Sequence, residues 1–213
     1  MENLGNIRER YLKGELNIED LAKDPISQFD RWYQDAEKAE ADEPNAMTLA
    51  TVNTEGQPSA RIVLLKGFGQ KGFAFYTNYN SQKGQELKDN PKAALVFWYK
   101  ELQRQIRISG TVEKLSYEAS QSYFHSRPKG SQIGAIASPQ SEIITKEGLV
   151  QRFTDIELKH KDDTSIPLPG HWGGYVLKPN VIEFWQGRDN RLHDRIKYTL
   201  SDDGEWGVVR LAP

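Results

Sequence analysis

The pattern of apolar and polar residues changes its period near residue 47. Before this point, apolar residues recur at helical spacing through ISQFDRWYQDAEKAEAD, which begins beside Pro25 and is closed by EPNA. We therefore expect the first 45 residues to be helical, with residues 1–46 forming an arm or cap. From Met47 onward the period is two, as in β-strands, so residues 47–213 are predicted to form the main domain.

Alternating segments predict strands along this domain. MTLATVN and SARIVLLKGF are joined by the turn-like TEGQP and predict a hairpin, and strands are also expected in GFAFYTN, AALVFWY and RQIRISGTVEKL. The chain then returns to strands in GYVLKP, VIEFWQG, RLHDRIKYTL and EWGVVRLAP. Turns are expected between them at Lys178-Pro179-Asn180 and at Asp202-Asp203-Gly204.

Helices are predicted between these strands. Ser81 is placed to cap SQKGQELKDNP, which Asn90-Pro91 ends. SYEASQSYFHSRPKGSQIGAIAS is expected to form two helices broken at Pro128, and KEGLVQRFTDIELKHK a longer one. Strands interrupted by a few helices indicate a mainly β (α+β) fold, an antiparallel barrel with helical insertions.

Composition narrows the possible chemistry. The chain has no cysteine, which excludes disulfides, thiol nucleophiles and cysteine-ligated metals and fits a reducing compartment. The polar start MENLGNIRERYLKG and the absence of an apolar run of about 18 residues lead us to expect a soluble, cytoplasmic protein that does not bind membranes. The four histidines have no metal-ligand spacing, so no metal is expected.

Charge is unevenly distributed. The formal net charge of −2 gives no indication of nucleic-acid binding. Residues 1–46 carry 6 Lys and Arg against 12 Asp and Glu, whereas residues 47–213 carry 22 against 18. If the protein binds an anion, we expect the second part to hold it.

The stretch NRLHDR places Arg191, His193 and Arg195 at alternate positions. In an extended strand these side chains share one face at intervals of about 6.6 to 7 Å. One interpretation is an anionic or electron-rich ligand, because clustered cations need a negative partner or solvent. The other is an exposed edge strand whose charges serve solubility.

RIVLLK has basic residues at both ends of an apolar centre. Arg61 and Lys66 are an odd number of residues apart, so a regular strand sends them to opposite faces. Either they serve two different anions, or a bulge redirects one of them. Basic ends on an apolar centre also occur in ordinary strands.

Two helix starts combine hydroxyl and basic side chains. In YFHSRPKGS, Tyr123 and Arg127 lie on one helical face and Ser131 can cap the next helix, an arrangement that suits a phosphomonoester. A solvent-exposed helical corner is the alternative. In YTNYNSQKG, a second such start contains Tyr76, Thr77, Ser81 and Lys83. No Gly-rich nucleotide fingerprint accompanies either start, so a nucleoside triphosphate is not expected.

Taken in order, these motifs identify a family resemblance. The motifs are RIVLLK, FYTN, YFHSRP with SQIGA, Gln140-Ser141, IEFWQG, RLHDR and the terminal RLAP, and the likeness runs from about Arg8 to the end. The chain resembles the pyridoxine/pyridoxamine 5′-phosphate oxidases. The resemblance implies an FMN-binding split β-barrel that works as a homodimer, with two FMN sites at the subunit interface built by both chains.

The resemblance also implies a set of site residues. FMN contacts are implied for Arg61, Ile62, Val63, Leu64, Leu65, Lys66, Tyr76, Thr77, Gln82, Lys83, Gln105, Gln140, Ser141, Trp185 and Arg195. The substrate phosphate would meet Lys66, Tyr123, Arg127 and Ser131, and the pyridine ring would lie near Arg191 and His193, the implied catalytic pair, under Arg8 and Tyr11. Gln82 departs from the pattern, since many members carry a basic residue there, and this bears on FMN affinity.

The implied reaction is oxidation of pyridoxine 5′-phosphate and pyridoxamine 5′-phosphate to pyridoxal 5′-phosphate. A hydride passes from the 4′ carbon to FMN, and O₂ is reduced to H₂O₂. Two alternatives remain open: another FMN split-barrel enzyme such as a flavin reductase, or a non-catalytic carrier of pyridoxal phosphate.

Overall fold

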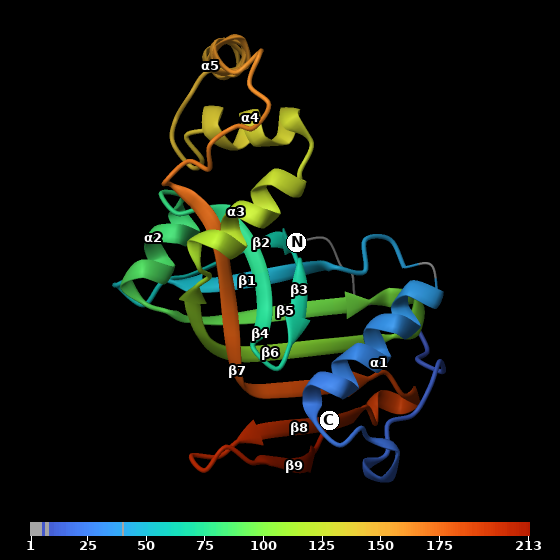
Figure 1. Ribbon diagram of the computed structural model, residues 1–213. Helices are drawn as coiled ribbons and strands as arrows, with labels where there is room; N and C mark the ends of the chain where they lie inside the picture. Colours follow the sequence, from blue (N-terminus) through green and yellow to red (C-terminus); the bar gives the residue numbers. More distant parts are fainter. Residues whose placement is uncertain (1–5, 7–8, 40) are drawn as a thin grey trace. The chain divides into compact units, whose positions relative to one another are not determined.

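The structure is a computed structural model that describes residues 6, 9–39 and 41–213 (Figure 1). Its strands are neighbours in the order β2-β1-β5-β6-β7-β4-β3, with β8 pairing with β7 and β9 with β8. The pairs β3–β4, β4–β7, β7–β8 and β8–β9 are antiparallel. The strands are β1 (Ala46–Val52), β2 (Pro58–Leu64), β3 (Gly67–Gly69), β4 (Gly72–Asn78), β5 (Lys92–Tyr99), β6 (Arg104–Lys114), β7 (Trp172–Gln186), β8 (Asp194–Leu200) and β9 (Trp206–Leu211).

Contacts divide the chain into two compact units. The first unit comprises the chain up to Leu49, Ala94–Gly110 and Pro179–Pro213. The second comprises Ala50–Ala93 and Thr111–Lys178. The expected division into an arm of residues 1–46 and a domain of residues 47–213 stays a prediction.

Helix α1 (Pro25–Lys38) belongs to the first unit. Asp24 caps it, accepting hydrogen bonds from the Ile26 and Ser27 amides at 2.9 and 3.0 Å, and Pro25 occupies the first turn, where no donor is needed. Trp32 packs edge-on against Phe184 of β7 with ring centroids 5.2 Å apart. The amphipathic helix predicted from the sequence is confirmed over these residues.

The expectation that the first 45 residues are helical is wrong for residues 41–45, which form bends and a turn, and for residues 9–24. Only a short 3-10 turn, η1 (Ile18–Asp20), interrupts irregular chain there. The backbone amides of Leu12 and Leu16 donate to the side chains of Gln103 and Asp194, at 2.9 and 3.1 Å. Side chains from distant segments thus satisfy groups that a helix would have paired internally.

The second unit carries the remaining helices predicted from the sequence. These are α2 (Gln82–Asp89), α3 (Tyr117–Ser126), α4 (Lys129–Ala137) and α5 (Lys146–Lys159). Ser81 caps α2 through the Gly84 amide, and Pro128 separates α3 from α4, as expected. The expectation that Ser131 caps the second of these helices is wrong, because α4 begins at Lys129 with Pro128 at its N-cap position. Phe124 and Ile133 of these helices join Trp172 of β7 in a buried apolar cluster.

Two predictions about the C-terminal strands are corrected. No turn forms at Lys178-Pro179-Asn180, because β7 runs without a break from Trp172 to Gln186. β7 pairs with β4 as far as Leu177 and with β8 from Val181, so Pro179 falls between these two ladders. Its missing N–H therefore removes no bond from either of them. The turn at Asp202-Asp203-Gly204 is confirmed, with Gly204 at φ 88°.

The second correction concerns NRLHDR. Arg191 belongs to a 3-10 turn, η3 (Asp189–Arg191), and β8 begins only at Asp194. Asn190 and Arg191 have φ values of 55° and 62°, in the left-handed region, which cannot continue a strand. The expected face of alternating side chains at Arg191, His193 and Arg195 therefore does not exist.

Candidate functional site

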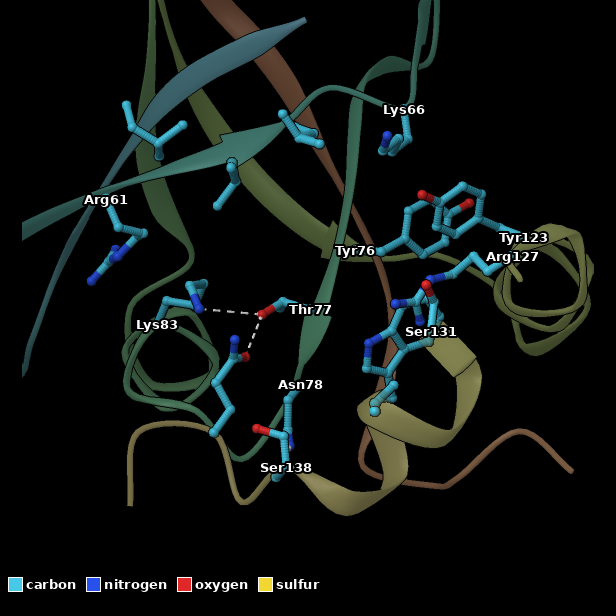
Figure 2. A pocket seen from close by; sticks show the side chains of 17 residues that line it. Arg61, Lys66, Tyr76, Thr77, Asn78, Lys83, Tyr123, Arg127, Ser131 and Ser138 are labelled. Carbon is cyan, nitrogen blue, oxygen red and sulfur yellow. Dashed lines mark hydrogen bonds between the residues drawn. The ribbon is translucent and has the colours of Figure 1, made fainter. Parts of the chain in front are cut away.

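A cavity of about 670 Å³ opens in the second unit (Figure 2). This volume lies within the range of small-molecule binding sites, about 300 to 1,000 Å³. Many of the residues that line it come from the predicted set: Arg61, Ile62, Val63, Leu64, Lys66, Tyr76, Thr77, Lys83, Tyr123, Arg127, Ser131 and Gln140. The others are Asn78, Gly134, Ala135, Ser138 and Trp172, which the sequence analysis did not select.

Aromatic rings stack at one side of this cavity. The rings of Tyr76 and Tyr123 lie 3.8 Å apart at an interplanar angle of 22°, and Trp172 is nearly parallel to Tyr123 at 6.1 Å. Burial raises the pKa of Tyr76, and the neighbouring phenols Tyr123 and Tyr79 raise it further. The stack fixes α3 against β4 and β7, so the side chains that α3 carries into the cavity are held in place.

Arg127 follows α3 and is the most unusual group of the cavity. Its guanidinium lies over the Trp172 ring, 4.8 Å from the centroid. Burial lowers the pKa of Arg127, while Tyr123 acts in the opposite direction. Its Nη1 is buried and has no hydrogen-bond partner among the described residues. Arg127 is one of the residues that line the cavity, and a cation with an unpaired buried donor favours an anionic ligand beside it.

Arg61 is held by a buried carboxylate. Glu86 of α2 is 6% exposed and lies 3.3 Å from Nη2 of Arg61, and Ser59 and Thr51 complete the network. Burial opposes ionisation of Glu86, but hydrogen bonds from Thr51, Ser59 and Gln82 and the charge of Arg61 outweigh it, so the pKa of Glu86 is lowered. Glu86 was not among the predicted residues.

Lys83 approaches the cavity from the first turn of α2. Its Nζ donates to Oγ1 of Thr77 at 3.4 Å, and Thr77 donates to Oε1 of Gln140 at 3.2 Å, both drawn as dashed lines in Figure 2. Burial lowers the pKa of Lys83, Arg61 lowers it further, and Glu86 opposes both. Lys66 lies beyond the end of β2, which is Leu64, and also lines the cavity. The rule that an odd spacing sends two strand residues to opposite faces therefore does not apply to Arg61 and Lys66.

Three predicted cofactor residues in the second unit do not line this cavity. Leu65 is buried at 5% exposure. The backbone N–H of Gln82 donates to Oγ of Ser141 at 3.2 Å, and the Gln82 side chain donates to Glu86 at 2.9 Å. Gln82 therefore supports the carboxylate that holds Arg61.

The other predicted residues that the structure describes lie in the first unit. Tyr11 packs edge-on against Trp185 and His193, with centroids 5.8 and 5.6 Å away, and Trp185 and His193 are 4.6 Å apart. Arg191 and His193 line a cavity of about 620 Å³ together with Glu9, Tyr11, Arg188, Asp189 and Asn190. Gln105 lies on β6, and Arg8 lies outside the described residues.

Arg195 and His193 each have a defined partner. Arg195 donates through Nε to the buried Glu183 at 2.9 Å and through Nη1 to the Ala212 carbonyl. His193 accepts a hydrogen bond from the backbone N–H of Arg188. Burial lowers the pKa of His193, and the charge of Arg191 lowers it further while Asp194 opposes both.

Comparison with known proteins decides the family. Residues 33–158 match the family described as pyridoxamine 5′-phosphate oxidase, and residues 172–213 match the C-terminal dimerisation region of pyridoxine 5′-phosphate oxidase. The chain belongs to the pyridoxine/pyridoxamine 5′-phosphate oxidase family. As a member of this family it is an oxidoreductase, and it carries the dimerisation region.

Relatives named pyridoxine/pyridoxamine 5′-phosphate oxidase match over the full length. The protein of Salinibacter ruber is 54% identical, with all of both chains covered. That of Trichormus variabilis is 52% identical, covering 99% of this chain and 98% of its own.

Solved structures confirm the fold class, an antiparallel split β-barrel with peripheral helices. PhzG from Burkholderia lata, in complex with tetrahydrophenazine-1-carboxylic acid, has a TM-score of 0.86 at 29% identity, covering 92% of this chain and 95% of its own. An FMN-binding protein of Nostoc punctiforme, related to pyridoxamine 5′-phosphate oxidase, has a TM-score of 0.73 at 18% identity and covers 91% of this chain and all of its own. In the part of the chain that the structure describes, no helix has the length and apolar character needed to span a membrane.

Proposed function

We propose that the chain oxidises pyridoxine 5′-phosphate and pyridoxamine 5′-phosphate to pyridoxal 5′-phosphate, with FMN as cofactor and O₂ as acceptor. Relatives of that name, matched over the full length, support this proposal. The observation that carries it is the unpaired, buried Nη1 of Arg127 in a cavity that also holds Lys66 and Tyr123. This is the donor set expected for a phosphomonoester.

The residues of the cavity in the second unit fit FMN. Arg61 and Lys83 supply positive charge near the first turn of α2, where the helix dipole also favours a phosphate. The strand residues Ile62 to Leu64 supply an apolar edge for a flat ring. When bound, FMN would accept a hydride from the 4′ carbon of the substrate and pass the electrons to O₂, which yields H₂O₂.

The protein's own residues would bind and orient the substrate. Lys66, Arg127 and the Ser131 hydroxyl would hold its phosphate, and the Tyr76 and Tyr123 stack would keep these groups in place. Arg191 of the first-unit cavity would position the pyridine ring by its charge, in a site that two copies of the chain build together. His193 lies beside Trp185. Its Nδ1 accepts a hydrogen bond from the Arg188 amide, so its Nε2 would be the atom that donates a hydrogen bond to the substrate. Holding the reactants in a productive orientation accounts for about 7 to 11 kcal/mol of the barrier in favourable cases.

A homodimer is part of this proposal. Residues 172–213 match the dimerisation region of the family. Large apolar side chains are exposed in this chain, including Ile62 at 65%, Trp98 at 48% and Val209 at 48%. A second copy of the chain would cover such residues. Light scattering on the purified protein gives the mass directly, and a monomer at all concentrations would contradict a dimer.

The likeness to PhzG supplies one competing function. PhzG is in complex with a tricyclic carboxylic acid that has no phosphate, and its structure is similar over most of this chain. A flavin reductase and a non-catalytic carrier of pyridoxal phosphate are further alternatives. The phosphate-binding donor set around Arg127 favours the oxidase over a PhzG-like activity and over a reductase.

A visible spectrum of the FMN-loaded protein, recorded before and after anaerobic addition of pyridoxine 5′-phosphate, tests the proposal. We expect the flavin absorbance to bleach and to return on admission of air, with pyridoxal 5′-phosphate and H₂O₂ formed in equal amounts. Bleaching only with NAD(P)H would indicate a reductase, and binding without bleaching a carrier. A protein that takes up no FMN would contradict the oxidase, the reductase and the cofactor assignment together.

A further inference from the structure

Residues 10–16, called the strap below, cross the first unit without regular secondary structure. Both ends are fixed by charged or polar contacts. At one end, Arg10 pairs with Asp189, Nη2 to Oδ2, at 2.5 Å. At the other, the Leu16 amide donates to Asp194 at 3.1 Å, and Arg210 donates to the Leu16 carbonyl at 2.9 Å.

The middle of the strap is held by one side chain, that of Gln103. Its Oε1 accepts from the backbone N–H groups of Leu12 and Lys13 at 2.9 and 3.2 Å. Its Nε2 donates to the carbonyl of Arg10 at 3.2 Å. A single amide thus satisfies three backbone groups, and Gln103 is only 8% exposed.

Gln103 also fixes the segment that faces the strap. Its own carbonyl accepts from the Gly187 amide at 2.8 Å and from Nε2 of Gln186 at 3.3 Å. Its φ and ψ of 52° and 44° lie in the left-handed region, where a residue other than glycine is uncommon. This left-handed conformation costs free energy, and the hydrogen bonds of Gln103 offset that cost.

Tyr11 is the residue that this arrangement positions. It lies between Arg10 and Leu12, whose backbone groups both bind Gln103. The Tyr11 ring packs directly on Gly187, since a Cβ added there would lie 2.9 Å from Cγ of Tyr11. In this position Tyr11 contacts Trp185 and His193 and lines the cavity that contains Arg191.

We propose that Gln103 is a positioning residue: it anchors the strap so that Tyr11 forms a wall of the Arg191 and His193 cavity. The consequence for substrate rests on the function proposed above, whereas the anchoring itself does not. The hydrogen bonds of the Gln103 side chain in the described part of the chain go to the strap and not to Arg191 or His193, so its loss acts through Tyr11. The expected kinetic effect is weaker substrate binding, with FMN binding unchanged.

Two substitutions separate hydrogen bonding from packing. Gln103→Met keeps the length and approximate volume of the side chain but removes all three bonds to the strap. Gln103→Glu keeps an acceptor for Leu12 and Lys13 and loses only the donor to Arg10. Gln121→Met makes the same chemical change on α3, where the exposed Gln121 side chain donates to the Tyr117 hydroxyl, and serves as the matched control.

Limited trypsin digestion of the full-length protein, followed by mass spectrometry, measures the anchoring. Cleavage after Arg10 and Lys13 requires the strap to leave Gln103, so its rate reports the open population. We expect cleavage at these two bonds to be at least about tenfold faster in Gln103→Met than in wild type, and intermediate in Gln103→Glu. The control is expected to match wild type.

Steady-state kinetics with pyridoxine 5′-phosphate and an FMN titration complete the test. We expect Gln103→Met to raise KM several-fold while the FMN Kd stays at the wild-type value, and Gln103→Glu to restore part of the loss. Unchanged cleavage at Arg10 and Lys13 overturns the proposal, as does an equal loss of FMN and substrate affinity. If cleavage accelerates but wild type itself does not turn over the substrate, the anchoring stands and the proposed function fails.

Discussion

The backbone N–H of Arg188 donates a hydrogen bond of 3.1 Å to Nδ1 of His193. A backbone amide can only donate, so Nδ1 must be the unprotonated nitrogen, and the proton of the neutral ring lies on Nε2. The pKa of His193 is lowered by burial and by Arg191, which keeps the ring neutral at physiological pH. His193 is therefore equipped to donate a hydrogen bond and not to accept a proton at Nδ1.

We predict that His193→Gln retains more activity than His193→Asn. A glutamine amide can place a donor near the position of Nε2, whereas an asparagine can only replace the acceptor at Nδ1. The expected difference in kcat is about tenfold, the value of one hydrogen bond near a reacting group. A two-bond ¹H–¹⁵N correlation spectrum should show Nε2 as the protonated nitrogen of His193. A proton on Nδ1, or equal activity of the two variants, contradicts the prediction.

Glu86 gives a prediction about acid stability. Its folded pKa lies below the ordinary value of 4.5, so its stabilising contribution is complete above that pH and is lost as the pH falls through the lower folded pKa. Glu86→Gln should lower the free energy of unfolding by about 3 kcal/mol at pH 7, because Arg61 loses its buried partner. Urea unfolding at pH 7 and at acid pH should show this difference shrinking as the pH falls.

The control for Glu86 is Glu55→Gln, on an exposed residue between β1 and β2. Its unfolding curves are expected to stay within about 0.5 kcal/mol of wild type. A constant difference between Glu86→Gln and wild type at every pH would show that the charge of Glu86 is not the source of its effect.

Arg127→Met should separate binding from stability. Removing an unpaired buried donor offsets the loss of the contact with Trp172, so the ligand-free protein should change in stability by less than about 1 kcal/mol. KM for pyridoxine 5′-phosphate should rise at least about 30-fold with kcat nearly unchanged, because a phosphate contact contributes equally in ground and transition states.

Inorganic phosphate provides an independent readout for Arg127. In the FMN-loaded protein, inorganic phosphate should raise the melting temperature of wild type but not that of Arg127→Met. The control Lys129→Met should respond like wild type, because Nζ of Lys129 binds the Lys161 and Asp163 carbonyls outside the cavity. An equal response in all three proteins would place the phosphate elsewhere.

Gly187→Ala should displace Tyr11. The added Cβ would lie 2.9 Å from the ring, closer than van der Waals contact permits, and the ring must move away from Trp185 and His193. We expect a loss of about 1 to 3 kcal/mol in the free energy of unfolding and a several-fold rise in KM. Gly69→Ala is the control, since a Cβ there has no neighbour within 4 Å. A wild-type KM in Gly187→Ala would show that the Tyr11 wall does not matter for substrate.

Local signals in the sequence were enough for much of the fold. Asp24 and Pro25 mark the start of α1, and Ser81 and Pro128 mark helix ends in the second unit, because caps and prolines act over a few residues. The hairpin of β1 and β2 follows from alternation on both sides of a turn. Part of the lining of the second-unit cavity was predicted from single motifs, such as the helix start with Tyr123, Arg127 and Ser131. The rest was predicted only because whole motifs resembled a known family.

Other features depend on contacts that no local pattern contains. Arg191 leaves the strand because its backbone and that of Asn190 are left-handed, although the alternation of NRLHDR is typical of a strand. Pro179 remains inside β7 because it falls between the ladders to β4 and β8. Glu86 and Gln103 look like ordinary polar residues in sequence, and only their partners, far away along the chain, show what they do.

Gln103 binds the strap through main-chain atoms, so the exposed side chains of the strap can be substituted without loss of these hydrogen bonds. All three bonds come from main-chain atoms of residues 10, 12 and 13, and the Leu12 side chain is 64% exposed. Because the chain has no cysteine, Leu12→Cys would introduce a single reactive thiol beside Tyr11. A dye attached there would turn this segment into an optical sensor of ligand occupancy.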